Sequence, residues 1–150
     1  MARALRIYRR IGNLRGEAGA LNWLGRVRCS TGDFPGALDV HARALEIVRR
    51  SGDRVDESWV LTHYAATIAA TGEHPRALAL YQQALTMSRE LNFPAQQAVS
   101  LEGIADHHLA TGNPTQGTEH LRRALQIYQR LGMRADIERV AARLAGLAPQ

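Results

Sequence analysis

The sequence predicts an all-α fold, a right-handed α-solenoid built from stacked pairs of helices. Two landmarks repeat with one period, and the apolar residues between them recur at helical spacing. The first landmark is a tripeptide that recurs at one fixed interval, at Thr31-Gly32-Asp33, Thr71-Gly72-Glu73 and Thr111-Gly112-Asn113. A period of about 20 to 50 residues is typical of folds that stack one supersecondary unit on the next.

The second landmark is an Ala-Leu pair followed two positions later by Ile or Met. It keeps the same interval as the first, at Ala4–Ile7, Ala44–Ile47, Ala84–Met87 and Ala124–Ile127. Two independent landmarks in one register make coincidence a poor explanation. The register also defines which residues occupy equivalent positions in successive units.

Apolar residues recur every three or four positions twice in each unit, so each unit is predicted to hold two amphipathic helices. The first helices carry Leu21, Leu24 and Val27, then Leu61, Tyr64, Ala65 and Ile68, then Leu101, Ile104 and Ala105. The second helices carry Phe34, Ala37, Leu38, His41, Ala44, Leu45 and Val48, then Ala77, Leu78, Tyr81, Ala84 and Leu85, then Leu121, Ala124, Leu125 and Tyr128. Because one helix pair cannot bury its own apolar stripe, neighbouring pairs must stack.

The breaks between helices have explicit chemistry. The Gly of each Thr-Gly tripeptide can adopt a positive φ, and the Asp, Glu or Asn that follows can cap the next helix. Pro35, Pro75 and Pro114 lie at or near the first turn of that helix, where a missing N–H costs little. In the other turn of the unit, Asn92 replaces the Gly found at position 52.

The predicted organisation is a single array over residues 1–150. Residues 1–12 form a half repeat, which is the second helix of a unit without its first. Three full repeats are expected over residues 14–52, 54–92 and 94–132, and residues 134–150 are expected to form a capping helix. The start on a second helix suggests truncation of a longer chain, with a misplaced start codon or a dimer contact as alternatives.

Composition predicts a folded chain in a reducing compartment. Hydrophobic residues make up 45% and charged residues 22%, which argues against general disorder. No apolar run approaches the roughly 20 residues that span a bilayer, and residues 1–30 lack a signal-peptide core, so a cytoplasmic location is expected. Cys29 is the only cysteine, which excludes an internal disulfide. All 19 basic side chains are arginine, which suggests a GC-rich, actinobacterial genome.

These repeats resemble the tetratricopeptide repeat. The match runs through Leu24-Gly25 and Gly32-Asp33-Phe34 in the first full unit, through Gly72 and Tyr81 in the second, and through Ile104-Ala105 in the third. Leu21, Arg28 and His108 stand where the family usually has aromatic residues, and the terminal Pro is missing. Gly25, Ala65, Ala105 and Ala145 occupy one equivalent position, so we expect two helices to approach closely there.

The 40-residue period is longer than the usual 34 or so. In this respect the chain is similar to the arrays of kinesin light chains and to those that follow nucleotide-binding modules in actinobacterial transcriptional regulators. Residues 16–22 and 128–132 have that character. The resemblance implies a protein- or peptide-binding scaffold, the interaction or sensor module of a regulator. A stand-alone adaptor, or a homodimer through the N-terminal half repeat, is the alternative.

The resemblance also implies that the first helices line a concave, partner-binding surface. Carried over by register, its residues are Asn22, Arg26, Cys29, Trp59, Thr62, Ala66, Ala69, Val99, Glu102, Asp106 and Arg139. Trp59 is the best anchor candidate, because a large amphipathic ring offers contact area at low entropic cost, although packing between stacked helices would also explain it.

Two pairs on that surface have competing explanations. Asn22 and Arg26 lie one turn apart and could hold a partner's carboxylate, but a solvated helix face is the simpler interpretation. Glu102 and Asp106 repel each other at i, i+4. A basic partner would compensate for that repulsion, and so would Arg139 on the next first helix, which we favour.

Other function classes have little support. Adjacent helical residues point about 100° apart, so His107 and His108 cannot both face one metal ion, and no metal or other cofactor is predicted. His41 and His108 are expected instead at core aromatic positions. No catalytic motif is present, so no enzymatic activity is expected. The arginines at helix C-termini offset helix dipoles, which makes direct nucleic-acid contact an unnecessary explanation of the net charge of +5.

Overall fold

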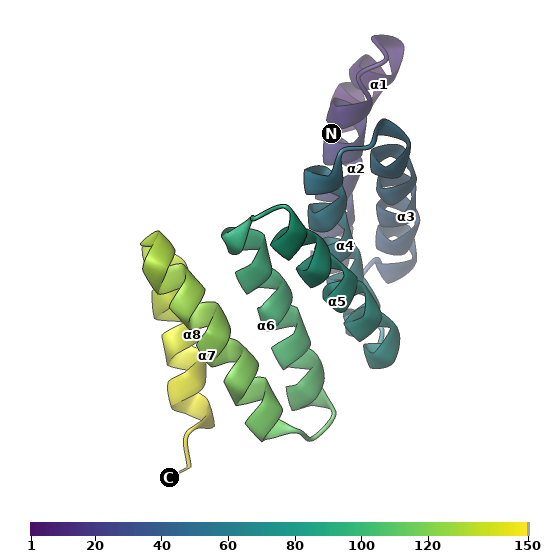
Figure 1. Ribbon diagram of the computed structural model, residues 1–150. Helices are drawn as coiled ribbons and strands as arrows, with labels where there is room; N and C mark the ends of the chain where they lie inside the picture. Colours follow the sequence, from purple (N-terminus) through teal and green to yellow (C-terminus); the bar gives the residue numbers. More distant parts are fainter. Residues whose placement is uncertain (150) are drawn as a thin grey trace.

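The computed structural model describes residues 1–149, and within them the chain folds into eight α-helices and no strand. Figure 1 shows the helices following one another as antiparallel pairs along a single stack, with α1 at one end and α8 at the other. The all-α solenoid is therefore confirmed. The helices are α1 (Ala2–Arg10), α2 (Leu14–Ser30), α3 (Phe34–Ser51), α4 (Arg54–Ala70), α5 (His74–Glu90), α6 (Pro94–Ala110), α7 (Pro114–Leu131) and α8 (Arg134–Leu147).

We call α2, α4, α6 and α8 the A helices, and α1, α3, α5 and α7 the B helices. In each complete repeat an A helix packs on the B helix that follows it, as α2 does on α3, α4 on α5, and α6 on α7. Each A helix also contacts the B helix before it. Every element therefore contacts only near neighbours in the chain, as expected for a solenoid.

The turns use the predicted residues. Gly32 has a φ of +83° and Gly52 a φ of +72°, a region that side chains with a Cβ rarely adopt. Asn92 takes the equivalent place with a φ of +53°, so the substitution of Asn for Gly is confirmed as a helix stop. Prolines occupy the first turns of α3, α5, α6 and α7.

The expected side-chain caps form in only some of the turns. Asp33 accepts a hydrogen bond from the Gly36 backbone N–H at 3.0 Å, as expected. Glu73 and Asn113 do not cap their helices, and that prediction was wrong. The Glu73 carboxylate pairs with Arg76 instead, and the Asn113 amide donates to Thr111 Oγ1, so other local partners displace the backbone N–H.

The apolar stripes meet in two adjoining core clusters. One is centred on α4 to α8 and contains Leu101, Leu121 and Tyr128, and the other is centred on α1 to α5 and contains Leu21 and Val48. The close approach predicted at Gly25 is confirmed, because a Cβ at that position would lie 2.5 Å from the His41 ring. His41 is fully buried, as expected of a core aromatic position, whereas His108 is only half-buried.

Candidate partner-binding surface

The A helices lie side by side and form one face, here called the A-helix face. α2 contacts α4, α4 contacts α6, and ion pairs join α6 to α8. One repeat-equivalent position on this face holds Asn22, Thr62 and Glu102, and a second holds Trp59, Val99 and Arg139. The expected surface residues thus come from consecutive A helices, but the structure distributes them over three different environments.

The first environment is a pocket of about 270 Å³ between α2 and α4. Its floor is apolar or small, and Trp59 and His63 provide an aromatic wall, with ring centroids 5.9 Å apart and nearly parallel. Phe93 supports Trp59 from behind in an edge-to-face contact at 5.8 Å. The pocket is lined by Arg15, Ala18, Gly19, Asn22, Val48, Asp56, Trp59, Val60 and His63.

Polar groups at this pocket are uncharged or sit at its rim. The Asn22 side-chain amide lies 2.9 Å from His63 Nδ1 and joins α2 to α4. Burial, together with the nearby positive charge of Arg26, lowers the pKa of His63 to about 4, so its ring is neutral at pH 7. Arg15 pairs with Asp56 at 3.0 Å on the rim. The wall therefore carries no charge at pH 7, and the Asn22 amide beside it is held in place by His63.

Arg26, one turn from Asn22, is exposed. Its guanidinium lies over the Trp23 ring, 4.9 Å from the centroid, and forms no ion pair with a carboxylate of residues 1–149. Asn22 is already bonded to His63, so Asn22 and Arg26 do not form a ready-made pair for one carboxylate. Arg26 alone offers an uncompensated charge beside the pocket.

The second environment is the junction of α4 and α6, and it is closed. Thr62 is only 2% exposed, and its hydroxyl donates to a backbone carbonyl of its own helix. Gln96, from the first turn of α6, donates from Nε2 to Thr62 Oγ1 at 2.9 Å and to the Ser58 carbonyl at 2.9 Å. A partner cannot reach the Thr62 side chain, so we do not carry it into the proposed surface. Val99 remains half-buried on the same face.

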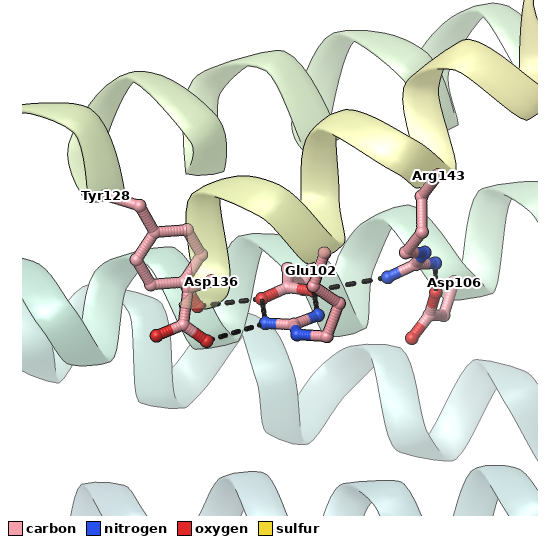
Figure 2. Close-up of polar contacts among 6 residues, drawn as sticks. Glu102, Asp106, Tyr128, Asp136 and Arg143 are labelled. Carbon is pink, nitrogen blue, oxygen red and sulfur yellow. Dashed lines mark hydrogen bonds and ion pairs between the residues drawn. The ribbon is translucent and has the colours of Figure 1, made fainter. Parts of the chain in front are cut away.

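The third environment is an ion-pair network between α6 and α8, shown in Figure 2. Glu102 receives two hydrogen bonds from Arg139, at 2.5 and 2.8 Å, and a third from the Tyr128 hydroxyl at 2.7 Å. Arg143 donates to the same carboxylate at 3.2 Å and also pairs with Asp106. Arg139 holds Asp136 as well, at 2.9 Å. The favoured pairing of Glu102 with Arg139 is confirmed.

Electrostatics of this network favour the ionised form of Glu102. Burial by itself would raise the pKa of this carboxyl, which is only 8% exposed. The hydrogen bonds from Arg139 and Tyr128, and the charges of Arg139 and Arg143, outweigh burial and hold the pKa below its usual value. The Glu102 carboxylate is fully used inside the chain, whereas Asp106 and Arg139 keep exposed surface.

Sequence reasoning did not find three groups in these junctions. His63 and Arg143 occupy equivalent positions two repeats apart, and both reach back to the preceding A helix. The register could have indicated this, because it places both residues immediately after the Asn22 and Glu102 position. Tyr128 belongs to the apolar stripe of a B helix. That stripe does not indicate that the Tyr128 hydroxyl reaches Glu102.

The clustered histidines lie away from the A-helix face junctions. The His107 and His108 rings diverge at 74°, and His107 Nδ1 lies 3.1 Å from the His74 carbonyl oxygen. Within residues 1–149, no group of three or more His, Cys, Asp or Glu side chains is arranged to hold a metal ion. In the same part of the chain, no helix has the length and apolar character that crossing a membrane requires.

Solved structures share this architecture. BtubC (BKLC) from P. vanneervenii superposes with a TM-score of 0.83 at 20% identity, over 97% of this chain and 62% of BtubC. The TPR domain of Arabidopsis FLU gives 0.69 at 16% identity, over 80% of this chain and 98% of that domain. The apo form of RapI gives 0.79 at 19% identity, over 95% of this chain and 41% of RapI. At such identities the likeness concerns the fold alone.

The comparison with families is more specific. The family model described as tetratricopeptide repeat matches residues 16–90, which is half of the chain and includes every residue that lines the pocket between α2 and α4 except Arg15. No curated protein is similar enough in sequence to count as a relative. The repeat register, the packing of A and B helices and the family match agree, and the chain belongs to the tetratricopeptide repeat family.

Proposed function

We propose that this protein is a binding scaffold that holds a peptide segment of a partner protein along the A-helix face. The observation that carries the proposal is the pocket between α2 and α4, where an aromatic wall and an apolar floor lie beside a single orienting amide. Pockets with this composition suit an apolar side chain, with specificity supplied by a few polar groups.

Trp59 is the proposed anchor, because Phe93 and His63 hold its ring in place before any partner arrives. A pre-ordered aromatic group loses little freedom on binding. Asn22 and Arg26 would contact the partner's backbone or an acidic group next to the inserted side chain. Val99, Asp106 and Arg139 would extend the surface toward α8, while Thr62 and Glu102 support it from within.

The broader setting is also part of the proposal. We infer an interaction or sensor module of a bacterial, actinobacterial, transcriptional or signalling regulator, supported by the exclusive use of arginine and by the long repeat. The second candidate is a stand-alone cytoplasmic adaptor, or a homodimer through the N-terminal half repeat. The exposed apolar side chains of Ile7 on α1 and Ile11 just after it support the homodimer.

A peptide library tests the groove. The immobilised chain would be panned with random peptides, and selected peptides would be titrated against the Trp59→Ala variant. We expect binding to weaken by about 30-fold or more, as for a central aromatic hot spot. Trp23→Ala is the comparison variant, since Trp23 is 51% exposed and lies outside the pocket. Its ring contacts the proposed surface through Arg26, so its loss should weaken binding far less, by about threefold at most.

Two outcomes would count against this site. Selected peptides that bind the Trp59→Ala variant as tightly as the wild type would move the site elsewhere. Equal losses in the two tryptophan variants would indicate non-specific adhesion to exposed aromatic rings. Thermal unfolding of both variants shows whether the contact of Trp59 with Phe93 matters for stability, which keeps a folding defect separate from a binding defect.

A further inference from the structure

One repeat-equivalent row of the A-helix face carries opposite charges on different helices. Its members, from α2 to α8, are Arg26, Ala66, Asp106 and Gly146, and all four are exposed. α2 contacts α4, and α4 contacts α6. A straight path from Arg26 to Asp106 therefore crosses α4 at Ala66, over a small side chain that carries no charge.

The α2 end of this row is positive after the ion pairs are counted. The other charged side chains of α2 and α4 are all paired: Arg9 with Glu17, Arg15 with Asp56, Arg28 with Asp33, Arg49 with Glu57, and Arg54 with Glu90. Asp53 also reaches Arg15, at 3.9 Å, but it caps the opposite end of α4, about 20 Å along the helix axis from Ala66. The charge of Arg26 is therefore left for a binding partner.

The α6 end of the row is negative. The network between α6 and α8 joins two guanidinium groups to three carboxylates and so carries one unbalanced negative charge; its members are Arg139, Arg143, Glu102, Asp106 and Asp136. The other charged side chains of α8, Arg134 and Glu138, pair at 3.6 Å and cancel. Asp106 lies at one edge of the network (Figure 2) and is 54% exposed, compared with 32% for Asp136 and 10% for Glu102. The unbalanced charge is therefore most accessible at Asp106.

The distance between the two ends limits what can bridge them. Packed helices lie about 8 to 10 Å apart, so Arg26 and Asp106, two helices apart, are separated by about 16 to 20 Å. An extended chain covers this distance in about five or six residues, whereas a helical segment needs about 12. Ala66 and Ala70 are the exposed side chains of α4 at the crossing, and their small size leaves room for an extended backbone.

We propose that the partner is an extended, charge-polarised peptide segment, with an acidic residue over Arg26, an apolar side chain in the α2/α4 pocket and a basic residue over Asp106. This inference rests on the proposed function and specifies the chemistry of its ligand. The acidic and apolar residues are close in the segment, because Asn22 of the pocket lies one helical turn from Arg26. The two charges also select one orientation, since the reversed segment brings like charges together at both ends.

A peptide library tests the predicted pattern. Blocked peptides of about 16 residues, randomised around one fixed Leu, would be panned on the immobilised chain at pH 8, above the usual imidazole pKa of about 6.5. Enriched peptides should carry an acidic residue near the Leu and a basic residue about five or six positions from the acidic one. A copy with these two charged residues exchanged should bind about tenfold more weakly in about 20 mM salt, and about 0.5 M salt should reduce the difference.

Charge variants of the chain assign each end. Arg26→Glu should weaken the enriched peptide about fivefold, and Asp106→Asn should abolish the preference for its basic residue over Gln. Arg50→Glu is the matched control, because Arg50 is exposed on α3, outside the A-helix face, and undergoes the same change of charge. It should leave binding of both peptides unchanged. Circular dichroism shows whether each variant keeps its helices, and the exchanged peptide tests the polarity on the wild-type chain itself.

Other outcomes would overturn the inference. Peptides that lose affinity with Trp59→Ala but show no charge pattern would refute it and leave the proposed function in place. Peptides that bind Trp59→Ala as tightly as the wild type, or a library that yields no binder, would refute both. Charges about 12 positions apart would indicate a helical ligand. Equal losses for Arg26→Glu and Arg50→Glu would indicate general attraction to a basic protein rather than a polarised site.

Discussion

The α2/α4 junction and the α6/α8 junction use the same backbone register with opposite chemistry. Asn22 and Glu102 are equivalent, as are Trp59 and Arg139, and so are His63 and Arg143. In the first junction these positions carry an amide and two neutral rings and leave a pocket. In the second they carry a carboxylate and two guanidinium groups, and ion pairs fill the space.

On the proposed function, this difference separates a junction that binds a partner from a junction that is closed. An aromatic wall and a neutral amide need few partners inside the protein, so they can contact a partner molecule. Charges in a buried position must instead be paired with other groups of the protein. Three side chains per junction carry this difference, and the helix spacing differs as well, because the backbones of α2 and α4 approach each other closely whereas α6 and α8 are joined through long side chains. Substitutions in the two junctions separate these roles, and the largest effect is expected at Glu102.

Removing Glu102 should strongly weaken the α6/α8 junction. Glu102→Ala leaves Arg139, Arg143 and the Tyr128 hydroxyl without their shared acceptor, and we expect a loss of about 3 kcal/mol. Chemical denaturation measures the loss, and hydrogen exchange should show faster opening of α8 than of α2. Equal acceleration in both helices would mean that the network does not act locally.

Lowering the pH should weaken the α2 side first. Burial lowers the pKa of His41 to about 4 in the folded chain, compared with about 6.5 when unfolded. The unfolded chain therefore binds more protons across this window, and stability present above pH 6.5 is lost as the pH falls. His41 alone accounts for about 2 kcal/mol between about pH 7.5 and pH 5.

Two comparisons test the assignment to His41: the pH dependence of the variant His41→Leu, and the pH dependence of the α6/α8 junction. The variant should lose that part of the pH dependence, and parallel curves for variant and wild type would contradict the assignment. Glu102 has a lowered pKa, so its contribution is complete above its usual value of about 4.5 and declines only below it. Hydrogen exchange near pH 5 should therefore show α2 and α3 opening before α8.

Asp106→Ala should have the smallest effect. Asp106 is exposed and pairs only with Arg143, which also holds Glu102. We expect a loss below about 1 kcal/mol, reduced further by about 0.5 M salt. Denaturation midpoints at low and high salt measure it. A loss as large as that of Glu102→Ala would show that the two carboxylates act as one unit.

Periodicity alone predicted most of the fold. The constant repeat interval located the helices and the turns, and the small residue at position 25 indicated a close approach of two helices, which the structure places at His41. Periodicity failed for the caps of Glu73 and Asn113. Capping depends on whether a side chain finds the backbone N–H or another local partner first, and residue type does not decide that competition.

The surface was less predictable, because it depends on how far side chains reach between helices. The register placed Arg139 near Glu102, and that pair forms. It also placed Thr62 on the surface, but Gln96, from the next A helix, covers it. The contact of Phe93 with Trp59 was not predictable either, because Phe93 lies in a turn and belongs to no apolar stripe.

The open turns between helices have a consequence for how such chains diverge. Gly32, Gly52 and Gly72 are exposed, and a Cβ at any of them would meet no atom within 4 Å, so these three turn positions are not packed against another element. Loss of residues 54–93 would join α3 to α6 in the same register and bring Val99 opposite Asn22. One unit-sized deletion would thus exchange an aromatic wall for an aliphatic one. On the proposed function, duplication or loss of whole units would therefore change ligand preference in a single genetic event.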